Sequence, residues 1–356
     1  GKGVVNGKQI HRTFPVNPTQ PITAWGLIGA GIRAYDHMDG VGNRYGVHTV
    51  ILEVDGEEVF RSVVDRFAYE ENRYINSWTH GQYMKSFIEP GNRLRMLHAS
   101  NGNRGLVEIN EERPYRFVYT LSDALGNTSK VRFTVQGKNT EIHPVEHREK
   151  YAFKWDRTNY LQEPGLELVV PRGMLYDDVW LDYSVRADSG DVAFTYQLHN
   201  KRVPLHGACE MRIGLRRDRL EDKSKYYVAG VTARGGKYSI GGTYEDGFMK
   251  VRIRDLGTYT VAVDTVPPEI IPLNPGQWGR TGRITLKAKD KETGINSYRG
   301  TIDGKYALFG KPNSISGNLV CELDPKHVKK GGRHTVEMTV TDGRGNRTTE
   351  EFHFVW

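Results

Sequence analysis

The amino-acid sequence predicts an all-β protein of three tandem β-sandwich domains, of which the first and third are immunoglobulin-like. Three observations support this prediction. The 356 residues include 40 glycines and 10% aromatic residues, which is typical of strands joined by many tight turns. Helical periodicity is weak along the whole chain. One strand–turn–strand pattern also occurs twice, once in each outer part of the sequence.

The repeated pattern consists of two alternating strands joined by a turn of the form D-x-x-G-N. Its turn runs from Asp123 to Asn127 in the first copy and from Asp342 to Asn346 in the second. Glycine and asparagine tolerate the positive φ of a tight turn, and aspartate can accept hydrogen bonds from the backbone of its own turn. Both segments are therefore predicted β-hairpins.

The similarity between the two copies extends upstream. A strand ending at Asp36 or Asp290 is followed by a loop, and then by a strand that runs into an Asp-Gly turn at Asp55 or Asp303. We therefore interpret the first and third segments as two copies of one sandwich plan. The first copy is longer because of an insertion at about 61–115.

Composition and turn signals place the domain boundaries. We predict an immunoglobulin-like sandwich with an insertion at 1–140, a second sandwich at 141–265, and an immunoglobulin-like sandwich at 266–356. A proline-rich stretch at 264–272 opens the third domain, and paired prolines stiffen such junctions and stop strands from crossing them.

The charge distribution argues against a nucleic-acid partner. The net charge of +7 comprises +3 in residues 1–140 (17 basic and 14 acidic), zero in 141–265 (19 and 19) and +4 in 266–356 (14 and 10). Phosphate-binding surfaces concentrate their positive charge, whereas this excess is spread thinly. No stretch approaches the roughly 18 apolar residues of a membrane helix, so no membrane span is expected.

Catalytic motifs are missing from the sequence. It contains neither a G-x-S-x-G nucleophile elbow nor a P-loop, and no catalytic residue is predicted. The two cysteines, Cys209 and Cys321, are predicted to be buried thiols, because they are far apart and too few for a zinc knuckle. We expect no enzyme activity and no cofactor.

Two patterns are candidates for metal binding. Asp36, Asp39 and Asn43 place hard oxygen ligands, which suit Ca²⁺, in a glycine-rich loop. The loop lacks the D-x-D-x-D-G pattern, so a plain turn loop is the favoured alternative. His143 and His147 have the spacing of zinc ligands on a helix, but the proline between them favours a solvated linker.

One tryptophan is a candidate for a binding surface. The six tryptophans and nineteen tyrosines could stack on sugars, although aromatic residues of β-sandwiches more often belong to the core. Trp78 lies in the polar stretch 76–82, and we expect it to be the exposed tryptophan.

Several motifs in residues 1–140 resemble a known family. These motifs are Trp25-Gly-Leu-Ile-Gly-Ala-Gly-Ile-Arg-Ala-Tyr-Asp36, Arg73-Tyr-Ile-Asn76, Phe87-Ile-Glu-Pro-Gly-Asn-Arg-Leu-Arg95 and Ile109-Asn-Glu-Glu-Arg113. They resemble the region that follows the catalytic domain in lysostaphin-type zinc metallopeptidases of certain Gram-negative bacteria. In that family the peptidase domain cuts peptidoglycan cross-links, and immunoglobulin-like domains follow it.

The sequence departs from this family at the zinc ligands. The peptidases bind zinc through H-x-x-x-D and H-x-H, and none of the twelve histidines here belongs to either pattern. The resemblance therefore implies a non-catalytic, C-terminal part of such an enzyme, located in the periplasm or at the cell surface. It would position or regulate the peptidase, or bind peptidoglycan or another envelope protein.

Two alternatives to this hypothesis remain. The chain could be a stand-alone adhesion or glycan-binding protein of the cell surface, since tandem immunoglobulin-like domains commonly serve adhesion. It could also be a metal-dependent hydrolase that uses His143 and His147.

Overall fold

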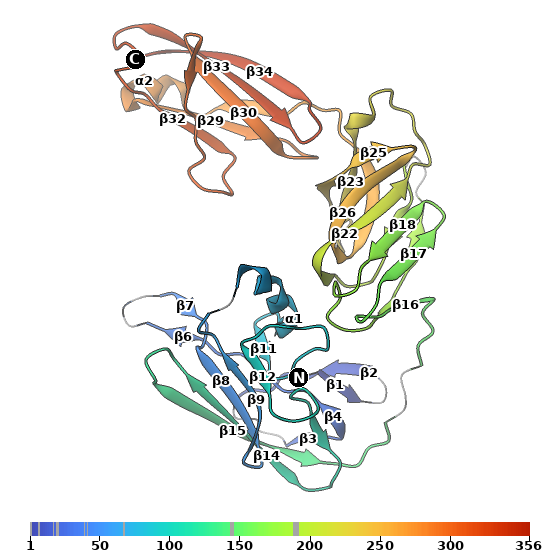
Figure 1. Cartoon of the computed structure of the whole chain (residues 1–356). Coiled ribbons are helices and arrows are strands. Elements are labelled where there is room, and N and C mark those ends of the chain that lie inside the picture. Colours follow the sequence, from blue (N-terminus) through green and yellow to red (C-terminus); the bar gives the residue numbers. More distant parts are fainter. Residues whose placement is uncertain are drawn as a thin grey trace. The chain divides into compact units, whose positions relative to one another are not determined.

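A computed structural model confirms the all-β fold (Figure 1). Strands contain 50% of the residues and helices 6%. The structure describes residues 2–5, 8–16, 18, 21–38, 40, 42–66, 68–142, 146–187 and 192–356. Within these ranges, no helix combines the length and the apolar character needed to cross a membrane.

The contacts between residues divide the chain into two compact units. The first comprises Gly1–Asn159, Val170–Leu181 and Pro204–Ala208, and the second comprises Tyr160–Val169, Asp182–Val203 and Cys209–Trp356. Residues of the middle segment belong to both units. The three-domain division at 140 and 265 stays a prediction.

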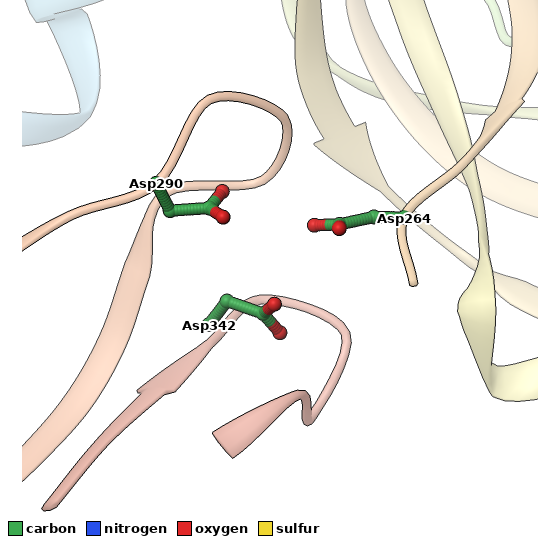
Figure 2. Close-up of side chains that lie close together, drawn as sticks. All are labelled: Asp264, Asp290 and Asp342. Carbon is green, nitrogen blue, oxygen red and sulfur yellow. The ribbon is translucent and has the colours of Figure 1, made fainter. Parts of the chain in front are cut away.

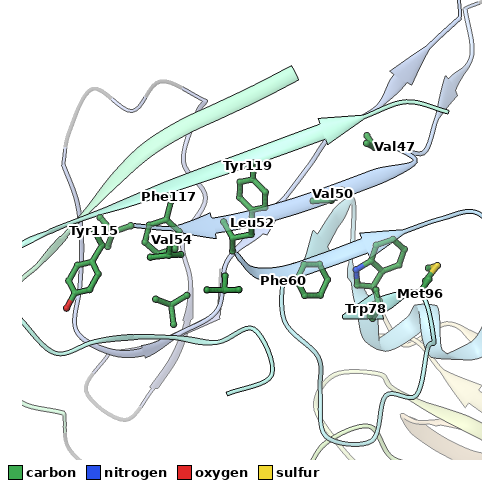
Figure 3. Packing of buried hydrophobic residues seen from close by; sticks show 14 of the residues in the cluster. Val47, Val50, Leu52, Val54, Phe60, Trp78, Met96, Tyr115, Phe117 and Tyr119 are labelled. Carbon is green, nitrogen blue, oxygen red and sulfur yellow. The ribbon is translucent and has the colours of Figure 1, made fainter. Parts of the chain in front are cut away.

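A six-stranded sheet forms one side of the first sandwich. Its order is β12 (Leu97–Ala99), β9 (Glu57–Val63), β8 (Thr49–Val54), β14 (Pro114–Ser122), β15 (Thr128–Gly137) and β3 (Ile22–Ala24). Side chains alternate across a strand, and every second residue of β8 is buried. Leu52, Phe60, Phe117 and Tyr119 form the centre of the resulting core (Figure 3).

Smaller sheets complete the first sandwich. One sheet has the order β13 (Val107–Ile109), β4 (Gly26–Ile28), β1 (Lys2–Val5) and β2 (Lys8–His11). Another has the order β10 (Thr79–His80), β11 (Tyr83–Lys85) and β5 (Gly31–Ile32), and β6 (Asp36–His37) pairs with β7 (Arg44–Tyr45). The short helices η1 (Tyr69–Tyr74) and α1 (Ile75–Trp78) lie in the predicted insertion.

The middle of the chain contains two five-stranded sheets and a two-stranded one. The first is β17 (Asn159–Glu163), β18 (Leu166–Val170), β22 (Val203–Gly214), β26 (Phe248–Leu256) and β25 (Thr243–Glu245). The second is β20 (Ser184–Arg186), β21 (Thr195–Gln197), β27 (Thr258–Val263), β23 (Tyr226–Val231) and β24 (Lys237–Gly241). The pair is β16 (Tyr151–Phe153) with β19 (Val179–Leu181), and η2 spans Lys223–Lys225. β23 lies against β26, which makes this region a sandwich.

The C-terminal sandwich packs a three-stranded sheet on a four-stranded one. The three-stranded sheet has the order β28 (Glu269–Pro272), β29 (Arg283–Lys289) and β32 (Asn318–Glu322). The four-stranded sheet has the order β31 (Lys305–Ala307), β30 (Ile295–Ile302), β33 (Arg333–Asp342) and β34 (Arg347–Val355). Helices η3 (Pro275–Gln277) and α2 (Trp278–Thr281) precede β29. The buried Trp278 fills the core beside Phe354, and its indole N–H donates to the Leu273 carbonyl at 2.8 Å.

The predicted repeat is confirmed at the level of strand order. The order β9-β8-β14-β15 in the first sandwich matches β31-β30-β33-β34 in the last. Asp55 and Asp303 adopt φ values of 53° and 51° in the corresponding Asp-Gly turns. Each carboxylate accepts a backbone N–H from the neighbouring strand, from Arg116 at 2.8 Å and from Thr335 at 3.0 Å.

The two cysteines are buried and form no disulfide, which confirms the predicted thiols. Burial raises the pKa of the Cys209 and Cys321 thiols to about 11, because the thiolate would lose its hydration.

Two tyrosine hydroxyls tie loops to the sandwich edges, as tyrosine corners do in immunoglobulin folds. The Tyr115 hydroxyl accepts the backbone N–H of Glu111 at 3.1 Å. The Tyr259 hydroxyl donates to the Asp255 carbonyl at 2.8 Å, and the Tyr259 side chain is fully buried.

We expect Tyr259→Phe to lower the free energy of unfolding by about 1–2 kcal/mol, because a buried hydrogen bond is lost and the Asp255 carbonyl loses a donor. Urea denaturation measures this change. Tyr160→Phe is the matched control, since Tyr160 is 65% exposed, and it should change stability by less than about 0.5 kcal/mol. Equal losses in both variants would contradict the role assigned to the Tyr259 hydroxyl.

Candidate functional site

Three aspartates from separate segments of the second unit meet at one point. Asp264 follows β27, Asp290 follows β29 and Asp342 ends β33. One oxygen from each carboxylate lies within 4.8 Å of the other two (Figure 2). In the part of the chain that the structure describes, this is the one group of three or more acidic, histidine or cysteine side chains spaced to share a metal ion.

Asp342 is held by its own turn. Its Oδ1 accepts the backbone N–H groups of Arg344 and Asn346 at 2.8 and 2.9 Å, and its Oδ2 accepts the Asn346 side-chain amide at 2.7 Å. Asp123 accepts the backbone and side-chain N–H groups of Asn127 in the same way, at 2.9 and 2.6 Å. The D-x-x-G-N repeat therefore gives the same turn twice, as predicted.

The two turns differ in their surroundings. The first is exposed to solvent, whereas Asp342 is 1% and Asn346 8% exposed. The Asn346 amide also donates to the Asp264 backbone carbonyl at 3.1 Å. The second turn is thus bonded to the linker that leaves the preceding sandwich.

Arg344, in the middle of the same turn, reaches the preceding sandwich. Its guanidinium donates to the backbone carbonyls of Tyr226 and Gly242 at 2.9 and 3.0 Å. The Lys225 ammonium donates in return to the Arg344 carbonyl at 3.0 Å. One turn therefore contributes side-chain and backbone groups to the contact between consecutive sandwiches of this unit.

Asp290 organises the loop after β29. Its Oδ2 accepts the backbone N–H groups of Glu292, Thr293 and Gly294 at 3.0, 2.8 and 2.8 Å. The Thr293 hydroxyl donates to Asp264 Oδ2 at 2.5 Å. Asp290 is therefore connected to Asp264 through Thr293 as well as lying close to it.

The cluster has the ligand chemistry of a calcium site and the hydrogen-bond pattern of a structural joint. Ca²⁺ takes six to eight oxygen ligands, and three carboxylates could supply part of that set. Five of the six carboxylate oxygens, however, already accept hydrogen bonds from the protein. We therefore treat Asp264, Asp290, Asp342 and Asn346 as a structural unit, the Asp264 joint.

Burial has an electrostatic consequence at this joint. Asp264 is 1% exposed, and loss of hydration raises the pKa of its carboxyl group above the usual 3.8. The nearby charges of Asp290 and Asp342 raise this pKa further. The Asp264 carboxyl group is therefore harder to ionise in the folded protein than in the unfolded chain.

The calcium loop predicted from sequence is described in part. The Asp36 carboxylate accepts the backbone N–H of His37 at 2.8 Å, and Asn43 is exposed beside β7. Asp39 lies outside the described residues. Among the described residues Asp36 belongs to no group of three acidic, histidine or cysteine side chains, and calcium binding by this loop stays a prediction.

The expected exposure of Trp78 is wrong. Trp78 is 6% exposed in the first hydrophobic core, and its indole N–H donates to the Lys85 carbonyl at 3.1 Å (Figure 3). Ser77, Lys85 and Glu89 are buried beside it, whereas Asn76, His80 and Gln82 are exposed. The Lys85 ammonium pairs with Glu89 at 2.5 Å, and the Ser77 hydroxyl donates to the same carboxylate at 2.7 Å. Trp78 therefore points into the core from a stretch whose other polar side chains are largely exposed.

The histidine pair is also described in part. His143 lies outside the described residues. The ring of His147 stacks on Trp180 with centroids 3.6 Å apart, and its Nδ1 lies 3.4 Å from Glu149. Zinc binding by the pair stays a hypothesis.

Sequence reasoning did not identify the Asp264 joint. We interpreted Asp264 as part of a proline-rich linker, Asp290 as the end of a strand and Asp342 as a turn residue. The available signal was that all three aspartates stand directly at the ends of predicted strands, where they can meet at one edge of a sandwich.

Comparison with known proteins gives one family match. Residues 150–264, about a third of the chain, match the family described as Zu5-like domain. A search of curated proteins found no match for the chain.

Three solved structures illustrate the similarity to other multidomain chains. A Ca²⁺-stabilized adhesin with which an Antarctic bacterium binds ice is 11% identical, with 94% of this chain and 95% of that chain covered and a TM-score of 0.17. SGBP-B of the Bacteroides ovatus mixed-linkage glucan utilization locus, in complex with a mixed-linkage heptasaccharide, is 11% identical, with 97% and 68% covered and a TM-score of 0.16. Protocadherin gamma B7 is 9% identical, with 86% and 66% covered and a TM-score of 0.21. TM-scores this low do not show a shared arrangement of whole chains, and these similarities carry no functional argument.

We expect Asn346→Ala to lower the free energy of unfolding by about 2–3 kcal/mol, because it leaves the buried acceptors of Asp264 and Asp342 without their donor. Asn127→Ala is the matched control in the exposed copy of the turn. Water can replace its amide there, so the loss should stay below about 1 kcal/mol. Urea denaturation gives both values, and equal losses would contradict the importance of burial.

The raised pKa of Asp264 predicts a pH effect of defined sign. The folded state holds this proton more tightly than the unfolded state, whose pKa is near 3.8. The ionised carboxylate therefore destabilises the fold above the folded-state pKa. As pH falls through that pKa towards 3.8, the contribution of Asp264 to stability should improve.

Asp264→Asn removes this titration and leaves the other carboxylates in place. The free energy of unfolding of the wild type, minus that of the variant, should rise as pH is lowered from 7 to 4. Denaturation at several pH values measures the difference, and a flat or falling difference would contradict the prediction. The same measurement with Ca²⁺ and with a chelator separates the joint from a metal site. Stabilisation by Ca²⁺ in the wild type alone would show that the carboxylates bind the cation.

Proposed function

We propose that this chain is a non-catalytic binding and positioning module of the cell envelope. The observation that carries the proposal is that the Asp264 joint and the adjacent Arg344 connect consecutive β-sandwiches of the second unit through hydrogen bonds. A module of this kind presents surfaces to a partner in a defined order along the chain.

The joint supports a positioning role because an ordinary flexible linker would not need it. Flexible linkers leave their backbone groups to water and keep their conformational freedom. Here the linker carbonyl of Asp264 is bonded to Asn346, and the carbonyls of Tyr226 and Gly242 are bonded to Arg344. Ordering these side chains costs conformational entropy, which the hydrogen bonds offset.

The partner in this proposal is the peptidoglycan system. The motifs in residues 1–140 resemble the region after the catalytic domain of lysostaphin-type metallopeptidases, while the twelve histidines provide neither zinc-ligand pair. We infer that the chain positions or regulates such a peptidase, or binds peptidoglycan or another envelope protein. Its location would be the periplasm or the cell surface.

A stand-alone adhesion or glycan-binding function is the second candidate. It is favoured by an exposed pair of large side chains in the last sandwich. Tyr306 on the edge strand β31 is 63% exposed, and Leu308, two residues further on, is 74% exposed. An exposed tyrosine beside an apolar side chain can stack on a sugar ring.

Co-sedimentation with purified peptidoglycan sacculi tests the first candidate. We expect the protein to pellet saturably with sacculi and not with cellulose, because the proposal assigns it an envelope ligand. Arg344→Ala should reduce retention, since loosely joined sandwiches engage a polymer less effectively together.

A glycan array distinguishes the second candidate. Binding to other glycans but not to sacculi, lost in Tyr306→Ala and kept in the control Tyr160→Ala, would replace the peptidoglycan proposal with glycan-mediated adhesion. Tyr160 is a suitable control because it is equally exposed, at 65%.

A further inference from the structure

A large apolar cavity, open to solvent, lies in the first β-sandwich. Its volume is about 580 Å³, which falls in the range of roughly 300–1,000 Å³ typical of small-molecule sites. One wall is a single face of the β14–β15 hairpin, formed by Phe117, Tyr119, Leu121, Val131, Phe133 and Val135. The other wall comes from β3, β4, β5, β11 and the residues between them, including Ile22, Trp25, Ile28, Ile32, Ala34 and Met84.

The cavity is too large to be a packing defect. Protein cores contain few voids larger than a water molecule, whose share of liquid volume is about 30 Å³. Leu121, Val131 and Phe133 face the interior of the sandwich and are nevertheless only partly buried. Phe14 and Val16, which also line the cavity, are 42% and 65% exposed. The cavity therefore leaves apolar surface available to an occupant.

The charges around the cavity have one sign. Arg12, Arg33 and Lys85 line it, and none of the described lining residues is aspartate or glutamate. Glu89 neutralises Lys85 through its ion pair. Arg33 is exposed, and its guanidinium lies 5.8 Å from the centre of the Tyr35 ring. Within the described part of the chain it forms no ion pair. Arg33 thus offers a positive charge to an anionic group at the cavity.

The chemistry of the walls favours a hydrocarbon chain over a peptide. A peptide would bring backbone N–H and C=O groups, which need hydrogen-bond partners when buried. The walls consist mainly of aliphatic and aromatic carbon, and the Tyr119 hydroxyl is already bonded to Ser86 at 2.8 Å. An acyl chain has no polar groups that would need hydrogen-bond partners when buried.

We propose that the first sandwich binds one long-chain fatty acid, with its acyl chain in the cavity and its carboxylate beside Arg33. The apolar walls supply the binding free energy, and the cation selects the ionised acid over a neutral amphiphile. This inference is independent of the proposed envelope function.

Titration of the delipidated full chain with palmitate, monitored by calorimetry, tests the proposal. We expect saturable binding of one palmitate per chain, and weaker binding of the uncharged hexadecanol. Val131→Trp fills the cavity and should weaken palmitate binding at least tenfold. Thr134→Trp is the matched control, because it places the same side chain on the opposite, exposed face of β15, and it should bind as the wild type does.

The charge is tested separately. Arg33→Glu should weaken palmitate binding about fivefold and leave hexadecanol binding unchanged, as expected for a partly exposed ion pair. Arg132→Glu, on the exposed face of β15, is the control. Should Val131→Trp fail to fold, Ala34→Phe fills the same cavity from the opposite wall.

Three outcomes would overturn the proposal. Palmitate could fail to bind, or it could bind the Val131→Trp and Thr134→Trp variants equally well. The protein could also bind only to anionic phospholipid vesicles, with no change in Val131→Trp, which would indicate adsorption to a membrane surface and not occupation of the cavity.

Discussion

The hydrogen bonds of the Asn346 side chain are the constraint on which the second unit depends. This amide donates to the Asp342 carboxylate in its own turn and to the Asp264 carbonyl in the linker. All of these groups are buried, and a buried polar group without a partner costs more than a hydrogen bond gains. The turn and the linker therefore hold each other in place. Arg344 links the turn to the preceding sandwich through its hydrogen bond to the Tyr226 carbonyl.

The two copies of the turn have the same local structure but different roles in the protein. Asp123 and Asn127 form the same hydrogen bonds as Asp342 and Asn346, so the five-residue sequence determines the turn. The exposed copy only closes a hairpin. The buried copy connects domains because a linker residue, Asp264, lies within reach of its amide. Burial therefore determines what an identical turn contributes.

Features that depend on local sequence were predictable from the chain alone. Strand alternation, the Asp-Gly turns at Asp55 and Asp303 and the D-x-x-G-N hairpins all follow from backbone preferences within a few residues. The Asp264 joint was missed because it depends on three strand ends meeting in the folded protein. Trp78 was misinterpreted because an exposed polar stretch does not exclude one buried side chain, and Trp78 and Ser77 point inward while Asn76, His80 and Gln82 face solvent.

Many buried polar groups of this protein have hydrogen-bond partners, whereas part of its apolar surface lacks packing partners. This difference indicates where an apolar ligand would bind. At the Asp264 joint and around Glu89, buried polar atoms are bonded to other parts of the same chain. These hydrogen bonds satisfy polar groups that would otherwise be buried without a partner. The apolar surface of the first sandwich is not satisfied in this way, because the walls facing its cavity lack contacts across about 580 Å³. A hydrocarbon ligand would therefore gain its contacts where the hydrophobic packing of the first sandwich is incomplete.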